Sequence, residues 1–164
     1  MVSIVQSRKG DAVYFEDLSV YTYSSFFRPT ANSSNRNVRA LNVGWLDEQY
    51  PFPQGEVAAE FITRLFSWCE RPTNLYRGHH TCQFCRRQAA VRSACDIVLP
   101  NGNGEIHVFA SNDVVFVAPT LIGHYVAAHQ YLPPPEFILA INARMPSSAV
   151  KRANRVRRLG TDEE

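Results

Sequence analysis

The sequence predicts an α+β fold, with a small antiparallel sheet and about three helices on one face or at one end of it. Three observations carry this prediction. A meander of short β-branched and aromatic segments occupies residues 94–118. Amphipathic helical patterns lie on either side of it, at 56–70 and 120–131. A cluster of cysteines and histidines, "RGHHTCQFCRR" (77–87), stands between the first helix and the meander and indicates a zinc knuckle.

The amino-terminal part favours strands separated by polar loops. "AVYFEDLSVYTYSSFF" (12–27) is rich in aromatic and β-branched residues, which is typical of one or two strands. The polar segment "RPTANSSNRN" (28–37) predicts a loop, and the alternating segment "VRALNVGWL" (38–46) predicts a further strand. With two prolines and a glycine, "DEQYPFPQG" (47–55) predicts a turn or loop.

The segment "EVAAEFITRLFSWCE" (56–70) predicts the first helix. Its apolar residues recur at intervals of three or four positions: Val57, Phe61, Leu65 and Trp68. Glu56 stands near the expected amino terminus, where it favours the helix dipole, and Pro72 stands beyond the end. Cys69 falls on the apolar side, so we expect it to pack as a small hydrophobic residue.

The meander is predicted from three apolar runs. "CDIVLP" (95–100) and "EIHVFA" (105–110) flank "NGNG" (101–104), and "VVFVAP" (114–119) follows. Because Asn-Gly pairs adopt positive φ at little cost, "NGNG" predicts a hairpin turn.

Two more helical segments are expected after the meander. "TLIGHYVAAHQY" (120–131) predicts a helix with Thr120 as its amino-terminal cap. The three prolines at 133–135 end that helix, and "EFILAINAR" (136–144) predicts another.

Composition favours one globular domain over residues 1–150, stabilised by zinc, followed by a charged flexible tail at 151–164. Hydrophobic residues make up 45% of the chain, enough for a core. Residues 1–150 hold 12 basic and 12 acidic side chains, whereas the tail is basic. This balance argues against a wholly basic nucleic-acid binder.

We expect neither a membrane span nor a signal peptide. No stretch approaches the apolar length of a transmembrane helix, and the first apolar run is broken at Gln6. A cytoplasmic location without a membrane partner is therefore the expectation. In that reducing compartment, a Cys-x-x-Cys motif is more often a metal or redox site than a disulfide.

The Cys82 and Cys85 pair predicts half of a metal site, because a two-residue gap lets a tight turn aim both sulfurs at one ion. His124 and His129 are our first choice for the other two ligands, with His80 in reserve. Residues five apart in a regular helix are separated by roughly 140°. The helix must end before the prolines, however, and an irregular last turn would swing His129 round.

The chain order supports this set of ligands. A cysteine knuckle, a hairpin and then a helix with the second ligand pair is the order of a treble-clef zinc module. Two alternatives stay open: thiols that are merely reduced without a metal, and a thioredoxin-like redox pair. The choice among the three histidines, and between zinc and another metal, also stays open.

Several motifs resemble those of a family of small bacterial proteins with no characterised activity. They are "DLSVYTY", "GWLD", "FPQG", "RGHHTCQFC" and "APTLIGHYVAAHQYLPPPEF". The similarity covers roughly residues 14–142. It implies that the cysteine and histidine segments form one unit, and it supplies no reaction. The motif positions are held here by His80, Cys82, Cys85, His124 and His129.

The ligand set favours a structural metal. Four protein ligands close a tetrahedral site, and neither a HExxH motif nor the zinc-deaminase pattern occurs. We therefore expect a non-enzymatic zinc protein that binds another protein. The aromatic residues Trp45, Tyr50 and Phe52 are a candidate partner surface, although they could instead pack over the edge of the core.

Two other functions remain as alternatives. A zinc-dependent hydrolase would use three ligands, a bound water and a carboxylate base such as Asp47, Glu48 or Glu105. A nucleic-acid-binding zinc module would use the basic tail together with Arg86, Arg87 and Arg92.

Overall fold

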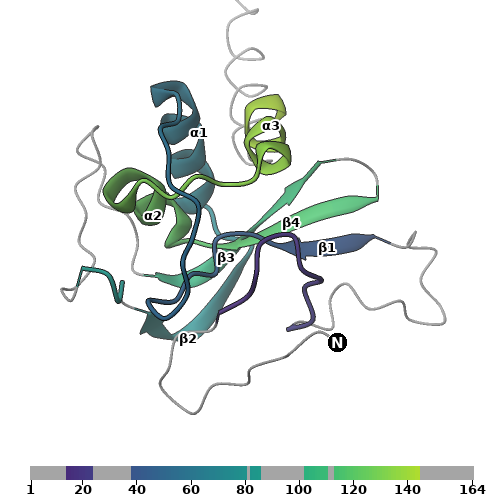
Figure 1. Cartoon of the computed structure of the whole chain (residues 1–164). Helices are drawn as coiled ribbons and strands as arrows, with labels where there is room; N and C mark the ends of the chain where they lie inside the picture. Colours follow the sequence, from purple (N-terminus) through teal and green to yellow (C-terminus); the bar gives the residue numbers. More distant parts are fainter. Residues whose placement is uncertain (1–13, 24–37, 81, 86–101, 111–112, 145–164) are drawn as a thin grey trace, which may run out of the picture.

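The fold was obtained as a computed structural model that describes residues 14–23, 38–80, 82–85, 102–110 and 113–144. It contains three helices and a four-stranded sheet (Figure 1). The strands are β1 (Arg39–Asn42), β2 (Asn74–His80), β3 (Gly102–Phe109) and β4 (Val114–Pro119). The helices are α1 (Ala59–Cys69), α2 (Ile122–His129) and α3 (Pro135–Ala143). The predicted α+β class is confirmed.

The sheet has the strand order β1-β4-β3-β2. β3 pairs antiparallel with both β2 and β4, as expected for a meander. β1 pairs with β4 in parallel, so the sheet is mixed and not purely antiparallel. The long connection through α1 allows this arrangement, since parallel neighbours need a crossover that no hairpin turn provides.

The prediction of a hairpin turn at "NGNG" is wrong for three of its four residues, because Gly102–Gly104 form the start of β3. A Cβ atom on Gly102 would overlap the side chain of Leu121, and one on Gly104 would lie 2.9 Å from the carbonyl oxygen of Asn74. The glycines therefore allow close approach of neighbouring segments. The strand expected at 95–100 and Asn101 lie outside the described residues, and β2 was not predicted.

The three helices cover one face of the sheet (Figure 1). Phe61, Leu65 and Phe66 of α1 are buried there against inward residues of β3 and β4, such as Ile106 and Phe116. The three-to-four spacing of the first helix and the two helices after the sheet are confirmed.

Thr120 is not the helix cap that the sequence predicted. Leu121 precedes α2 without a side-chain capping bond, and the buried Thr120 hydroxyl has no partner among the described residues. Thr120 itself follows directly on β4, and its backbone N–H donates to the carbonyl of Gly104. This bond holds the residue to the sheet, one position too early to cap the helix.

Residues 14–23 cover part of the opposite face of the sheet (Figure 1). The prediction of one or two strands at 12–27 is wrong for the described residues 14–23. They form only two isolated bridges, Phe15 to Trp45 and Val20 to Leu41. Leu18 has a φ of 62°, which breaks any extended run. The aromatic residues of this segment therefore act as a cover for the sheet, with Tyr21 buried on it.

No helix in the described part of the chain is long and apolar enough to cross a membrane. The predicted flexible tail at 151–164 lies outside the described residues.

A buried polar network lies on the face of the sheet opposite the helices, beneath residues 14–23. The Glu105 carboxylate accepts hydrogen bonds from the Tyr21 hydroxyl at 2.7 Å and from the Asn74 amide at 2.7 Å, and Nε2 of His107 lies 2.8 Å from it. Burial by itself would raise the pKa of Glu105, but the hydrogen bonds from His107, Tyr21 and Asn74 lower it below its usual value. The network thus holds an ionised carboxylate inside the protein.

We predict that Glu105→Gln lowers the free energy of unfolding by about 1.5–3 kcal/mol at pH 7, because it weakens charge-assisted hydrogen bonds. A carboxyl group with a lowered folded-state pKa contributes stability above its unfolded pKa and loses it as the pH falls through the folded value. The difference between wild type and variant should therefore shrink below about pH 4.5. Urea unfolding from pH 3 to 7 measures this difference in the free energy of unfolding, and Glu136→Gln, at an exposed position, is the control. A pH-independent difference would contradict the prediction.

Candidate metal centre

The sulfur atoms of Cys82 and Cys85 lie close to the imidazoles of His124 and His129. The cysteines come from the turn after β2, and the histidines come from α2. One ligand atom from each residue lies within 4.8 Å of all the others. The structure therefore brings together the four predicted ligands in a group that could hold a metal ion.

The spacing of the four atoms fits a single ion. Sγ of Cys85 lies 3.3 Å from Nε2 of His124 and 3.2 Å from Nε2 of His129. Sγ of Cys82 lies 3.3 Å from Nε2 of His129, and the two Nε2 atoms are 3.2 Å apart. Tetrahedral zinc with ordinary bond lengths holds its S and N ligands roughly 3.3–3.8 Å apart. These four distances lie within a few tenths of an ångström of tetrahedral values, and every pair of ligand atoms lies within 4.8 Å.

The end of α2 explains how two histidines five residues apart face one point. The backbone N–H of Gln130 donates to the carbonyl of Tyr125, five residues back, and not to the carbonyl four residues back. This wider turn holds more residues than a regular α-turn, which reduces the angle between positions 124 and 129. Gln130 then adopts a left-handed conformation, φ 55° and ψ 27°. The irregular last turn that the sequence predicted is present.

Electrostatics favour neutral imidazoles at this site. Burial, together with the neighbouring His129, lowers the pKa of His124 to about 4. Burial also lowers the pKa of His129 and raises the pKa of Cys82 to about 11. Neutral histidine is the form that binds metal, and a cation at the centre would reverse the effect of burial on the thiols.

The loop at 47–55 packs around the four-residue group. Its backbone is fixed to the chain after α2, since Pro53 accepts a hydrogen bond from Leu132 and Gly55 donates to Gln130. The side chain of Gln54 donates to the carbonyl of His129 at 3.3 Å. This role could not be predicted from the sequence, because the loop has no regular pattern and contributes neither cysteine nor histidine.

The aromatic residues proposed as a partner surface have different environments. Phe52 packs edge-on against Phe84 of the cysteine turn, with ring centroids 5.2 Å apart, and against Tyr131 at 6.0 Å. Tyr50 stacks on Tyr14. Trp45 is partly buried and borders a cavity. Phe52 and Trp45 thus pack over the edge of the core.

The other candidate residues lie elsewhere. His80, the reserve ligand, is exposed at the end of β2 and is outside the four-residue group. Cys69 is fully buried in the core, as expected. Arg86, Arg87, Arg92 and the basic tail, which carried the nucleic-acid alternative, lie outside the described residues.

Two of the carboxylates considered for a hydrolase are held by other parts of the protein. Glu105 belongs to the network on the opposite face of the sheet. Oδ1 of Asp47 accepts the backbone N–H of Gln49 at 2.9 Å. Glu48 lies beside the cysteine turn, where its backbone N–H donates to the side chain of Gln83.

The fold and the site define an α+β protein with a Cys₂His₂ group that could hold a metal ion. Residues 13–142 match a domain family of unknown function, DUF7919, and the chain therefore belongs to this family. The expected resemblance to an uncharacterised family is confirmed. No curated protein and no solved structure shows a significant match to the chain.

We predict opposite effects for two substitutions at Gln130, which directs the chain away from His129. Gln130→Gly should raise the free energy of unfolding by about 0.5–1 kcal/mol, because glycine adopts the left-handed conformation without a Cβ clash. Gln130→Val should lower it by about 1–2 kcal/mol, since a β-branched residue is strained there. Thermal unfolding of both variants tests this, and equal effects would show that the residue is not held left-handed.

Proposed function

We propose that this chain is a non-enzymatic protein whose single domain, residues 1–150, is stabilised by one zinc ion and binds another protein. The convergence of two cysteine sulfurs and two histidine nitrogens carries the proposal. Zinc accepts this mixture of soft and borderline ligands in tetrahedral geometry, whereas magnesium and calcium prefer oxygen. Reduced thiols are required, which suits a reducing compartment such as the cytoplasm.

A structural role for the metal follows from the number of ligands. Four protein ligands complete a tetrahedron, and catalysis needs one position for water or substrate. Cys82 and His124 are each only 1% exposed, so these two ligands are closed to solvent.

The metal would also connect segments that are distant in the sequence. Zinc at this point would tie the turn after β2 to the end of α2, around which the loop at 47–55 is folded. Structural zinc sites supply about 10–16 kcal/mol of apparent binding free energy at neutral pH, which exceeds the stability of most small domains. Folding of this part of the chain would thus depend on the ion.

A binding role is supported by the charge distribution and by the cavity beside Trp45. Residues 1–150 carry no net charge, which favours a protein partner over nucleic acid. Of the three aromatic residues predicted to form a partner surface, Trp45 borders a cavity, so the partner would contact the protein beside it.

We predict one zinc ion per chain, measured by elemental analysis of protein purified without added metal. Cys82→Ser should hold less than a tenth of this amount and should lose its cooperative thermal transition, because one ligand bond is removed. Two control variants, Cys69→Ala in the core and His80→Gln at the end of β2, should keep one zinc ion. Zinc loss in His80→Gln, or a metal-free protein that melts like wild type, would refute the proposal.

We predict that a cobalt(II)-substituted protein shows the visible absorption of a four-coordinate S₂N₂ site, and that excess cyanide or azide leaves this spectrum unchanged. All four positions are held by protein side chains, so no small anion can enter without displacing one. A spectrum that changes on titration with the anion would reveal an open position and would favour the zinc-hydrolase alternative. His129→Ala serves as the control, since it should open the site and make the spectrum respond.

A further inference from the structure

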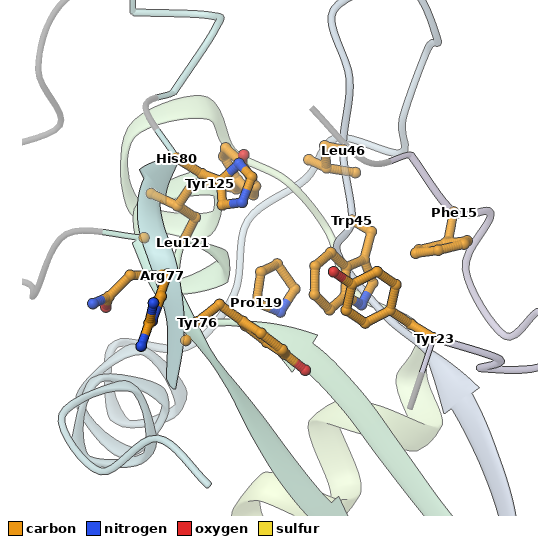
Figure 2. Close-up of a pocket in the computed structure, with 13 residues that line it drawn as sticks. Phe15, Tyr23, Trp45, Leu46, Tyr76, Arg77, His80, Pro119, Leu121 and Tyr125 are labelled. Carbon is orange, nitrogen blue, oxygen red and sulfur yellow. The ribbon is translucent and has the colours of Figure 1, made fainter. Parts of the chain in front are cut away.

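A cavity of about 120 Å³, whose lining includes none of the four candidate metal ligands, lies at the end of the sheet where β2 ends and β3 begins. Figure 2 shows Tyr76 and Arg77 of β2 on one side of it and Trp45, Tyr23 and Phe15 on the other, with Pro119 between the two sides. With Tyr125, five Phe, Tyr and Trp side chains line the cavity, and aromatic linings are typical of sites for small ligands.

The aromatic walls are held in place before any ligand arrives. Nε1 of Trp45 donates to the carbonyl of Val117 at 3.0 Å, and Phe15 packs edge-on against the indole with centroids 5.9 Å apart. Tyr23 and Tyr76 form a second edge-on pair at 5.7 Å. Because these contacts already restrict the rings, a ligand would lose less free energy to ordering them.

The volume limits the size of the ligand. An engineered apolar cavity of about 150 Å³ takes up one benzene molecule. A cavity of about 120 Å³ that opens to the surface thus has room for one six-membered ring, with any substituent directed to the rim. Bicyclic or larger groups would not fit inside.

The charge of the lining selects the substituent. No lining residue is acidic, whereas the positively charged Arg77 contributes to the wall. Arg77 is exposed and forms no salt bridge within the described part of the chain. The buried carboxylate of Glu105, which follows the lining residue Gly104, accepts hydrogen bonds from Tyr21 and Asn74 and is paired with His107. An anionic group at the rim would therefore meet positive charge, and a cationic group would not.

We propose that this cavity binds a single aromatic ring that carries an anionic group. The ring lies between Tyr76 and Trp45, and the anion faces Arg77. Two sources supply this chemistry: a free small aromatic acid, or a carboxyl-terminal phenylalanine of a partner protein. The site is separate from the four metal ligands and does not depend on the identity of the metal.

The test compares three probes of the same shape: phenylacetate, 2-phenylethanol and phenethylamine. Each is titrated into the zinc-loaded protein, and binding is followed by the indole signal of Trp45 and the amide signals of Gly102 and Gly104 in ¹H–¹⁵N spectra. We expect phenylacetate to bind with a Kd in the millimolar range or tighter, the alcohol more weakly and the amine most weakly. The indole signal is assigned with Trp68→Phe, which removes the other tryptophan.

Two variants test the walls. Arg77→Gln should weaken phenylacetate binding about two- to fivefold, as expected for a solvent-exposed charge pair, and should leave the alcohol unaffected. Arg144→Gln, which removes an exposed charge at the end of α3, should change neither. Tyr23→Ala should weaken all three probes together, because it removes one ring from the wall. Tyr23 is 61% exposed, so its removal should leave the fold intact.

A peptide that ends in phenylalanine distinguishes the two sources. Binding at least tenfold tighter than that of phenylacetate supports a partner's chain end, and equal binding supports a small aromatic acid. The proposal is overturned if no probe shifts these signals, if the amine binds as well as the acid, or if Arg77→Gln leaves the preference unchanged. Zinc content measured on the same samples separates this failure from a failure of the metal site.

Discussion

The meeting of two sulfurs and two imidazole nitrogens within 4.8 Å of one another is the constraint on which this part of the molecule depends. The cysteine turn is short and has no regular structure of its own, and α2 is only eight residues long. Isolated helices of that length are unstable in water. The stability of both segments must therefore come from tertiary contacts, and the four-residue group is where they meet.

The same constraint accounts for the irregular end of α2. A regular helix would point His124 and His129 in different directions, and the widened last turn removes this conflict. The turn gives up a regular helical hydrogen bond, but Tyr125 still accepts the N–H groups of Gln130 and Tyr131. The following prolines prevent the helix from continuing, so the backbone favours the geometry that the ligands require.

The sequence predicted those parts of the fold that depend on local pattern. The apolar spacing of α1, the apolar run of β4 and the Cys-x-x-Cys gap each correspond to a local geometry, and the structure contains all of these elements. The structure also brings the predicted cysteine and histidine segments together in one group.

The remaining features depend on contacts between distant segments, which a pattern along the chain does not contain. Gly102 and Gly104 suggested a turn, whereas they are small because Leu121 and Asn74 approach them closely. The aromatic segment 14–23 suggested strands, although it covers a face of the sheet. The parallel pairing of β1, the network around Glu105 and the aromatic cavity likewise exist only once the chain is folded.

The two sites meet at α2. His124 and His129 face the cysteines, while Leu121 and Tyr125 border the aromatic cavity, and Tyr125 also packs edge-on against Phe84 of the cysteine turn. The opposite wall of the cavity, by contrast, is held by the sheet, because Trp45 is hydrogen-bonded to β4. Loss of the proposed metal ion would therefore loosen the helical side of the cavity and leave the side next to Trp45 in place. The proposed structural metal would in this way also influence the proposed binding of a ligand, by holding one wall of the cavity against the other.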